Sequence, residues 1–162
     1  MPLALVTGTP PDLGPAAATL GRAGFDVVAW PATADAGAGP AGPFDCYLQL
    51  PCGPKNSDGR GPMAAPDLVC RIDGLAAVAG LLRPDASVIL GVEDGDVSAP
   101  MAAGDLLVAV ALALLEDLGR PAARIAVLSV ADLCRPPEEG GVAAVDPAVQ
   151  WEMPTPPLVS AP

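Results

Sequence analysis

The sequence predicts an α/β fold built on a mainly parallel β-sheet with helices on both faces. Short apolar runs alternate with longer segments of helical periodicity along most of the 162-residue chain. This alternation is typical of parallel strands that are joined by crossover helices. Residues 1–30 already read as a strand, a turn, a helix and a second strand, which is the opening unit of such a sheet.

The first elements follow from apolar runs that are bounded by turn residues. Residues 3–6 form an apolar run, predicted to be a strand, which is followed by Thr7-Gly8 and a proline-containing turn. A helix is predicted over 15–22, and a second strand over 26–30. Residues 31–43 are rich in Ala, Gly and Pro and lack apolar periodicity, so they are expected to be a loop or flexible link.

The remaining elements alternate in the same way. Apolar residues at helical spacing predict the first long helix, which Pro84 ends. The second long helix has Ser98 as a candidate N-cap, Pro100 in its first turn and Gly119 as its stop. We predict strands over residues 44–50, 87–92 and 124–130, and helices over residues 63–83 and 100–118.

This order of elements favours a reduced Rossmann-like, doubly wound sheet. One domain is expected over residues 1–135, followed by a Pro-rich extended tail over residues 136–162. The tail would either lie across a partner, with Trp151 and Met153 as anchors, or be disordered.

Composition and charge narrow the classes of partner. The formal net charge is −11 and the eight basic residues are scattered singly, which argues against nucleic acid and against an anionic membrane surface. The longest apolar run, 106–115, is too short to span a bilayer. The N-terminus lacks the basic region of a signal peptide, and the four cysteines lack the spacing of a zinc site. We therefore expect a reduced cytoplasmic protein.

Several segments match motifs of one enzyme family in the same order. Residues 7–14 follow the pattern T-G-x-x-x-G-x-G at Gly8 and Gly14, although Asp12 stands at the middle glycine. Residues 44–53 keep the Asp and the Gly of D-x-x-V-N-N-A-G, and 106–119 corresponds to a long helix. In these features residues 1–132 resemble the short-chain dehydrogenase/reductase family.

The resemblance implies catalytic residues that this chain does not carry. The family's serine follows the strand that corresponds to 87–92, where this chain has Val92-Glu93-Asp94. Residues 99–104 replace the Tyr-x-x-x-Lys motif, whose tyrosine donates a proton to the substrate. The one tyrosine, Tyr47, and the one lysine, Lys55, are wrongly spaced for that motif, and the chain has no histidine. No catalytic residue is assigned.

Gly8 and Gly14 are the candidate cofactor-binding residues. They would either let the backbone approach a phosphate of NAD(P), or only permit a tight turn between strand and helix. The Asp12 carboxylate would oppose a phosphate by roughly a few kcal/mol in a partly dry site. Between Trp30 and Phe44 there is also no room for the helix and strand that wall the family's adenine pocket. We expect no cofactor, with NAD(P) as the alternative.

Two other candidate sites have simpler interpretations. Glu93, Asp94 and Asp96 follow a strand and would offer oxygen ligands to Mg²⁺ or Ca²⁺, but such a turn is more often solvated. Cys52 has no histidine to activate it as a nucleophile, so a structural thiol is the better interpretation. No metal ligand is assigned.

Residues 106–115 predict an association surface. The segment is apolar all round for nearly three turns, whereas a helix that covers one sheet face needs one apolar stripe. Its alanines would let another helix approach, unless the monomer covers the helix completely. In the resembled family, the fourth and fifth helices form the dimer's four-helix bundle. The candidate interface residues are Leu106, Leu107, Val110, Leu114, Ile72 and Leu75.

These observations predict a non-catalytic subunit, a pseudoenzyme similar to short-chain dehydrogenases. It would associate through its two long helices, either with itself or as the structural half of a heteromeric dehydrogenase/reductase complex. The alternative is an NAD(P)-dependent oxidoreductase or a nucleotide-binding sensor at Gly8–Gly14, with Glu93 or Asp96 as acid or base.

Overall fold

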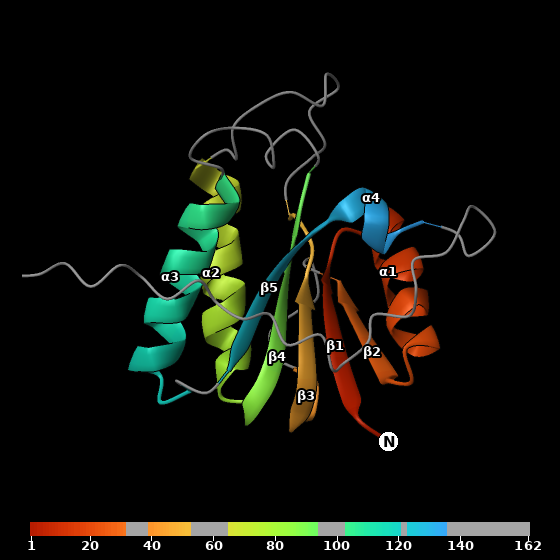
Figure 1. Cartoon of the computed structure of the whole chain (residues 1–162), viewed down its shortest axis with the longest axis horizontal. Coiled ribbons are helices and arrows are strands. Elements are labelled where there is room, and N and C mark those ends of the chain that lie inside the picture. Colours follow the sequence, from red (N-terminus) through yellow and green to blue (C-terminus); the bar gives the residue numbers. More distant parts are fainter. Residues whose placement is uncertain (32–38, 53–64, 94–102, 121–122, 136–162) are drawn as a thin grey trace, which may run out of the picture.

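Five parallel strands form one sheet, and helices cover both of its faces (Figure 1). The computed structural model describes residues 1–31, 39–52, 65–93, 103–120 and 123–135. The predicted tail, the candidate cap Ser98 and Pro100 lie outside the described residues. The Rossmann-like α/β architecture confirms the predicted fold class.

The strand order in the sheet is β2-β1-β3-β4-β5, and every neighbouring pair is parallel. The chain leaves β1 for β2 on one side and then returns to place β3 on the other side of β1. The carboxyl ends of β1 and β3 therefore meet where the strand order reverses, which is where open α/β sheets usually bind ligands. The strands are β1 Leu3–Gly8, β2 Asp26–Pro31, β3 Phe44–Gln49, β4 Leu82–Val92 and β5 Arg124–Ser129.

The helices divide between the two faces of the sheet. On one face α2 and α3 pack side by side, and on the other face α1 lies near the short helix α4 (Figure 1). None of the helices among the described residues has the length and apolar character needed to cross a membrane. The helices are α1 Pro10–Arg22, α2 Ala65–Ala79, α3 Ala103–Asp117 and α4 Val130–Leu133.

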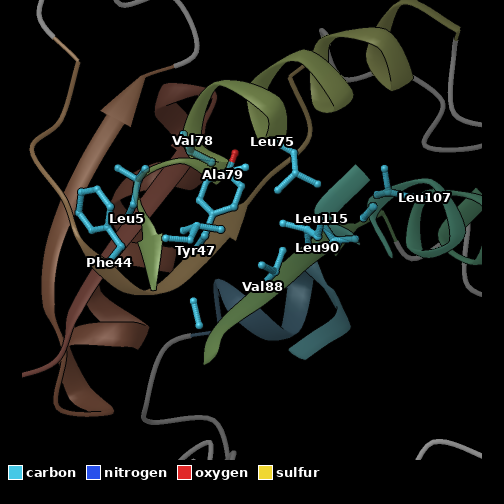
Figure 2. Close-up of a cluster of buried hydrophobic side chains, with 13 residues drawn as sticks. Leu5, Phe44, Tyr47, Leu75, Val78, Ala79, Val88, Leu90, Leu107 and Leu115 are labelled. Atoms are coloured by element: carbon cyan, nitrogen blue, oxygen red, sulfur yellow. The ribbon is translucent and has the colours of Figure 1, made fainter. Parts of the chain in front are cut away.

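Alternating side chains of the central strands build two separate cores. In β3, Tyr47 points to the α2–α3 face, whereas Cys46 and Leu48 belong to the core beneath α1 and α4. Figure 2 shows Tyr47 packed among side chains from the neighbouring strands and from α2 and α3. Because β3 is covered on both faces, all of its side chains except the half-buried Asp45 are buried.

Helix α1 begins earlier than predicted. The sequence placed a turn before residue 15, but the helix begins at Pro10, directly after Thr9. Prolines are tolerated in the first helical turn because its N–H groups have no partner within the helix. The prolines were interpreted as turn residues, whereas they occupy the first two positions of the helix.

The boundary between α2 and β4 also differs from the prediction. Helix α2 ends at Ala79, not at residue 83, and β4 begins at Leu82, not at residue 87. Leu82 pairs with Phe44, and the ladder is then irregular between Phe44 and Cys46. Pairing with β3 overrides the helical periodicity, and the irregularity accommodates Pro84 within a strand.

The end of β5 is the third place where the structure differs from the prediction. The sequence predicted a strand over 124–130, but β5 ends at Ser129 and the four-residue helix α4 follows, which was not predicted. The Ser129 hydroxyl accepts a hydrogen bond from the backbone N–H of Ala131 at 3.1 Å. Serine in this position stabilises a helix start, so the local signal was present in the sequence.

Candidate functional site

The two glycines of the predicted nucleotide loop do not form one cradle. Gly8 ends β1, and a Cβ atom added there would lie 2.6 Å from Cβ of Leu50. The Leu50 backbone N–H donates to the Thr7 carbonyl at 2.8 Å, which holds the two chains together at this point. Gly14 lies inside α1, and a Cβ atom added there would meet nothing within 4 Å. Gly8 therefore makes room for Leu50, whereas Gly14 approaches no other part of the described chain.

The first turn of α1 offers few donors to a phosphate. Pro10 and Pro11 hold its first two positions and carry no N–H group. The N–H groups of Asp12 and Leu13 donate to the Thr9 carbonyl at 3.2 and 3.1 Å. Anion sites at helix N-termini depend on N–H groups of this kind. The buried side chain of Asp12 also places a carboxyl group in this turn.

A buried polar network lies at the carboxyl edge of the sheet, where the strand order reverses. The hydroxyls of Thr7 in β1 and Tyr47 in β3 are 2.9 Å apart. Gln49 Nε2 donates to the Tyr47 hydroxyl at 3.1 Å and to the Arg71 carbonyl at 2.7 Å. The network thus joins two central strands to α2, and its side chains occupy the space next to the switch point.

Arg71 is the centre of this network. Its side chain is 1% exposed, although it carries a charge. Nη2 donates to the Gly91 carbonyl at 2.6 Å and lies 3.5 Å from the Gln49 carbonyl, so one guanidinium joins the ends of β3 and β4. Nη1 lies 3.9 Å from the carboxylate of Asp67, one turn earlier in α2. Asp67 in turn accepts a hydrogen bond from the Cys52 N–H at 2.9 Å.

Burial determines the protonation of Tyr47. It raises the pKa of Tyr47 from 10.0 to about 12, although hydrogen bonds with Thr7 and Gln49 act in the opposite direction. The side chain is completely covered, so the phenol is held as a neutral hydrogen-bonding group of the core. Lys55, the other residue compared with the family's motif, lies outside the described residues.

Among the described residues, the cysteines and acidic residues form no recognisable metal centre. Burial raises the pKa of Cys46 to about 12, and burial together with Cys70 and Asp67 raises the pKa of Cys52 to about 12. Glu93 follows β4, while Asp94 and Asp96 lie outside the described residues. Within the described part of the chain, no three Cys, Asp or Glu side chains are placed to hold a metal ion.

The predicted interface residues separate into two groups. Leu107 and Leu75 are only 2% and 3% exposed, because both point toward the sheet and belong to the monomer's core. They form no part of the described surface. Leu106 is 55% exposed, whereas Ile72, Val110 and Leu114 are half-buried.

The network around Arg71 was not predicted from the sequence. The sequence feature that could have indicated the network is Arg71 itself, a charged residue at a core-facing position of α2. It lies one helical turn from both Leu68 and Leu75. An arginine at such a position needs an acidic partner and carbonyl acceptors, and Asp67 and Gly91 supply them.

No protein-family model matches the chain, and no curated protein matches it either. The likeness to short-chain dehydrogenases therefore rests on the sequence motifs around Gly8, Gly14 and residues 106–119.

The roles of the two glycines predict different effects of alanine substitution. Gly8→Ala should lower the free energy of unfolding by about 1–3 kcal/mol, because the new methyl group collides with Leu50. Gly14→Ala is the matched control and should change it by less than about 1 kcal/mol, because the preference of alanine for a helix is offset by the constraint that Pro15 places on the residue before it. Urea denaturation measures both. Equal effects at the two positions would contradict this assignment.

Burial of Tyr47 predicts a loss of stability in alkali. Between about pH 10 and 12 the unfolded chain has lost the phenol proton and the folded chain keeps it, so the free energy of unfolding falls as pH rises. Tyr47→Phe should reduce this slope by up to about 1.4 kcal/mol per pH unit, leaving the contributions of Cys46 and Cys52. Denaturation at several pH values gives the slopes. Tyrosinate absorbance that develops near pH 10 in a still-folded protein would show that this account is wrong.

Proposed function

We propose that the chain is a non-catalytic subunit, similar to short-chain dehydrogenases, that acts by association through one face of α3. This surface, the α3 outer face, is formed by Leu106, Ala109, Val110, Leu112 and Ala113. Leu106 is 55% exposed and Leu112 is 38% exposed, while Ala109 and Ala113 are exposed and Val110 is half-buried. The proposal rests on this apolar surface.

The opposite stripe of α3 shows why the exposure is unusual. Leu107, Ala111 and Leu115 recur every four residues and pack onto the sheet, which is the single stripe that a surface helix needs. The outer face of the helix, however, also carries apolar residues, among them Leu106 and Leu112. Complete burial of a leucine contributes about 1.5–3 kcal/mol, so covering this face would stabilise an assembly. The small side chains of Ala109 and Ala113 would let a second helix approach closely.

A second copy of the chain is the partner that we propose for this face. A two-fold axis beside α3 would bring two identical apolar faces together, as in most homodimers. Glu116 and Asp117 are exposed at the carboxyl end of α3, and no basic residue lies in its last turn. A parallel pair would crowd these carboxylates, so an antiparallel arrangement is favoured. In the alternative heteromeric assembly, an active dehydrogenase-like subunit would cover the same face.

The described candidate site supports a role without catalysis. The buried phenol of Tyr47 and the side chains around Arg71 make hydrogen bonds within the core, and prolines hold the first two positions of α1. The same observations disfavour the alternative of an NAD(P)-dependent oxidoreductase or nucleotide sensor. We expect the assembly to work in the cytoplasm.

Charges on the α3 outer face should dissociate the assembly. The purified chain should have the mass of a dimer in size-exclusion chromatography with light scattering. Leu106→Glu combined with Val110→Glu should raise the dimer's Kd at least about tenfold, because the carboxylates would be desolvated at the contact. The matched control is Ala18→Glu, an exposed position of α1 on the other side of the sheet, which should leave the mass unchanged.

Three outcomes separate the alternatives. A wild-type monomer at high concentration would rule out the homodimer, and a native complex with a larger dehydrogenase subunit would favour the heteromeric assembly. A dimer that survives both charged residues would exclude the α3 outer face as its contact.

A further inference from the structure

Two cysteines that are far apart in the chain meet beside the buried network. Cys52 follows β3, and Cys70 lies in the first half of α2. The hydrogen bond from the Cys52 N–H to Asp67, one helical turn before Cys70, places the two cysteines side by side, and burial together with the Cys70 thiol raises the pKa of the Cys52 thiol. The Cys52 thiol also donates a hydrogen bond to the Leu50 carbonyl oxygen, with the sulfur 3.8 Å from that oxygen.

Asp67 fixes the backbone that presents Cys52. Its Oδ1 accepts the N–H of Cys52 at 2.9 Å, which ties the chain after β3 to α2. Asp67 and Cys70 are three residues apart in the helix and therefore lie on the same side of it. The hydrogen bond thus brings Cys52 next to the turn of α2 that carries Cys70.

The four cysteines differ in access and in neighbours. Cys70 is exposed and Cys52 is half-buried, so a small reagent in solvent can reach the pair. Cys46 is buried, and Cys134 is half-buried beside the Asp12 carbonyl; both belong to the opposite face of the sheet.

We propose that Cys52 and Cys70 form a reversible intramolecular disulfide when the protein meets a hydroperoxide. In the first step, the sulfur of Cys70 attacks one oxygen of the peroxide, the O–O bond breaks, a sulfenic acid forms, and the other oxygen leaves as water with the thiol proton. In the second step, the sulfur of Cys52 attacks the sulfur of Cys70. The S–S bond forms and water leaves, taking the proton of the Cys52 thiol. Two thiols are oxidised, and one hydrogen peroxide is reduced to two waters.

The surroundings of the two sulfurs indicate that Cys70 is oxidised first and that Cys52 then closes the disulfide. Cys70 meets the oxidant first because it is exposed. Burial, Cys70 and Asp67 raise the pKa of the Cys52 thiol, so Cys52 stays protonated and is a poor first nucleophile toward the oxidant. The disulfide would join the chain after β3 to α2 covalently, next to Arg71. This proposal is independent of association through α3.

The test uses the native full-length protein treated with hydrogen peroxide. After treatment, denaturation and alkylation, two of the four cysteines should be protected, and dithiothreitol should restore their alkylation. Lys55 and Arg60 lie between the two cysteines in the sequence, so trypsin separates them unless a disulfide links their peptides. Fragmentation of the linked peptides should assign the bond to Cys52, not to Cys46.

Matched variants complete the experiment. Cys52→Ser and Cys70→Ser should each abolish the linked peptides, whereas Cys134→Ser should leave them unchanged. Light scattering of Cys70→Ser should give the same mass as the wild type, which separates this proposal from the association. The proposal is overturned by a disulfide between two chains, by a bond to another cysteine, or by a Cys70 that is oxidised only to sulfinic acid.

Discussion

The buried guanidinium of Arg71 is the interaction on which the carboxyl edge of the sheet depends. It donates to the Gly91 carbonyl and lies beside Asp67, so one charged group joins β4, β3 and α2. Removing it would take away the side-chain donor of the buried Gly91 carbonyl, at a cost of about 1–3 kcal/mol. The same side chain, together with Gln49 and Tyr47, occupies the region where open α/β sheets usually hold a ligand.

We propose that, with this region occupied by core side chains, another surface of the protein carries its function. In related architectures, the switch point and the first helix together present a pocket and a set of phosphate donors. Here Gly8 accommodates Leu50, and prolines hold the first two positions of α1. Among the described residues, two of the exposed large apolar side chains, Leu106 and Leu112, lie on the α3 outer face. A packed sheet edge and an exposed apolar helix together fit a subunit whose role is to support a partner.

The sequence predicted the fold class and all five strands, because buried parallel strands produce apolar runs that local turns separate clearly. It misplaced boundaries where tertiary contacts compete with local periodicity, as at Leu82, whose pairing with Phe44 outweighs the helical pattern. The candidate site was harder to predict, because Arg71 gains its partners only when α2 packs beside β3 and β4. The apolar character of residues 106–115 was evident, but only the structure separates buried Leu107 from exposed Leu106.

We propose that packing has replaced nucleotide binding in this Rossmann-like domain. Calorimetric titration of the native full-length protein with NAD(H) and NADP(H) tests it most directly. We predict no saturable heat with either dinucleotide at millimolar concentration, because the first turn of α1 offers few donors and carries the Asp12 carboxyl group. Saturable binding with a micromolar Kd would contradict the account.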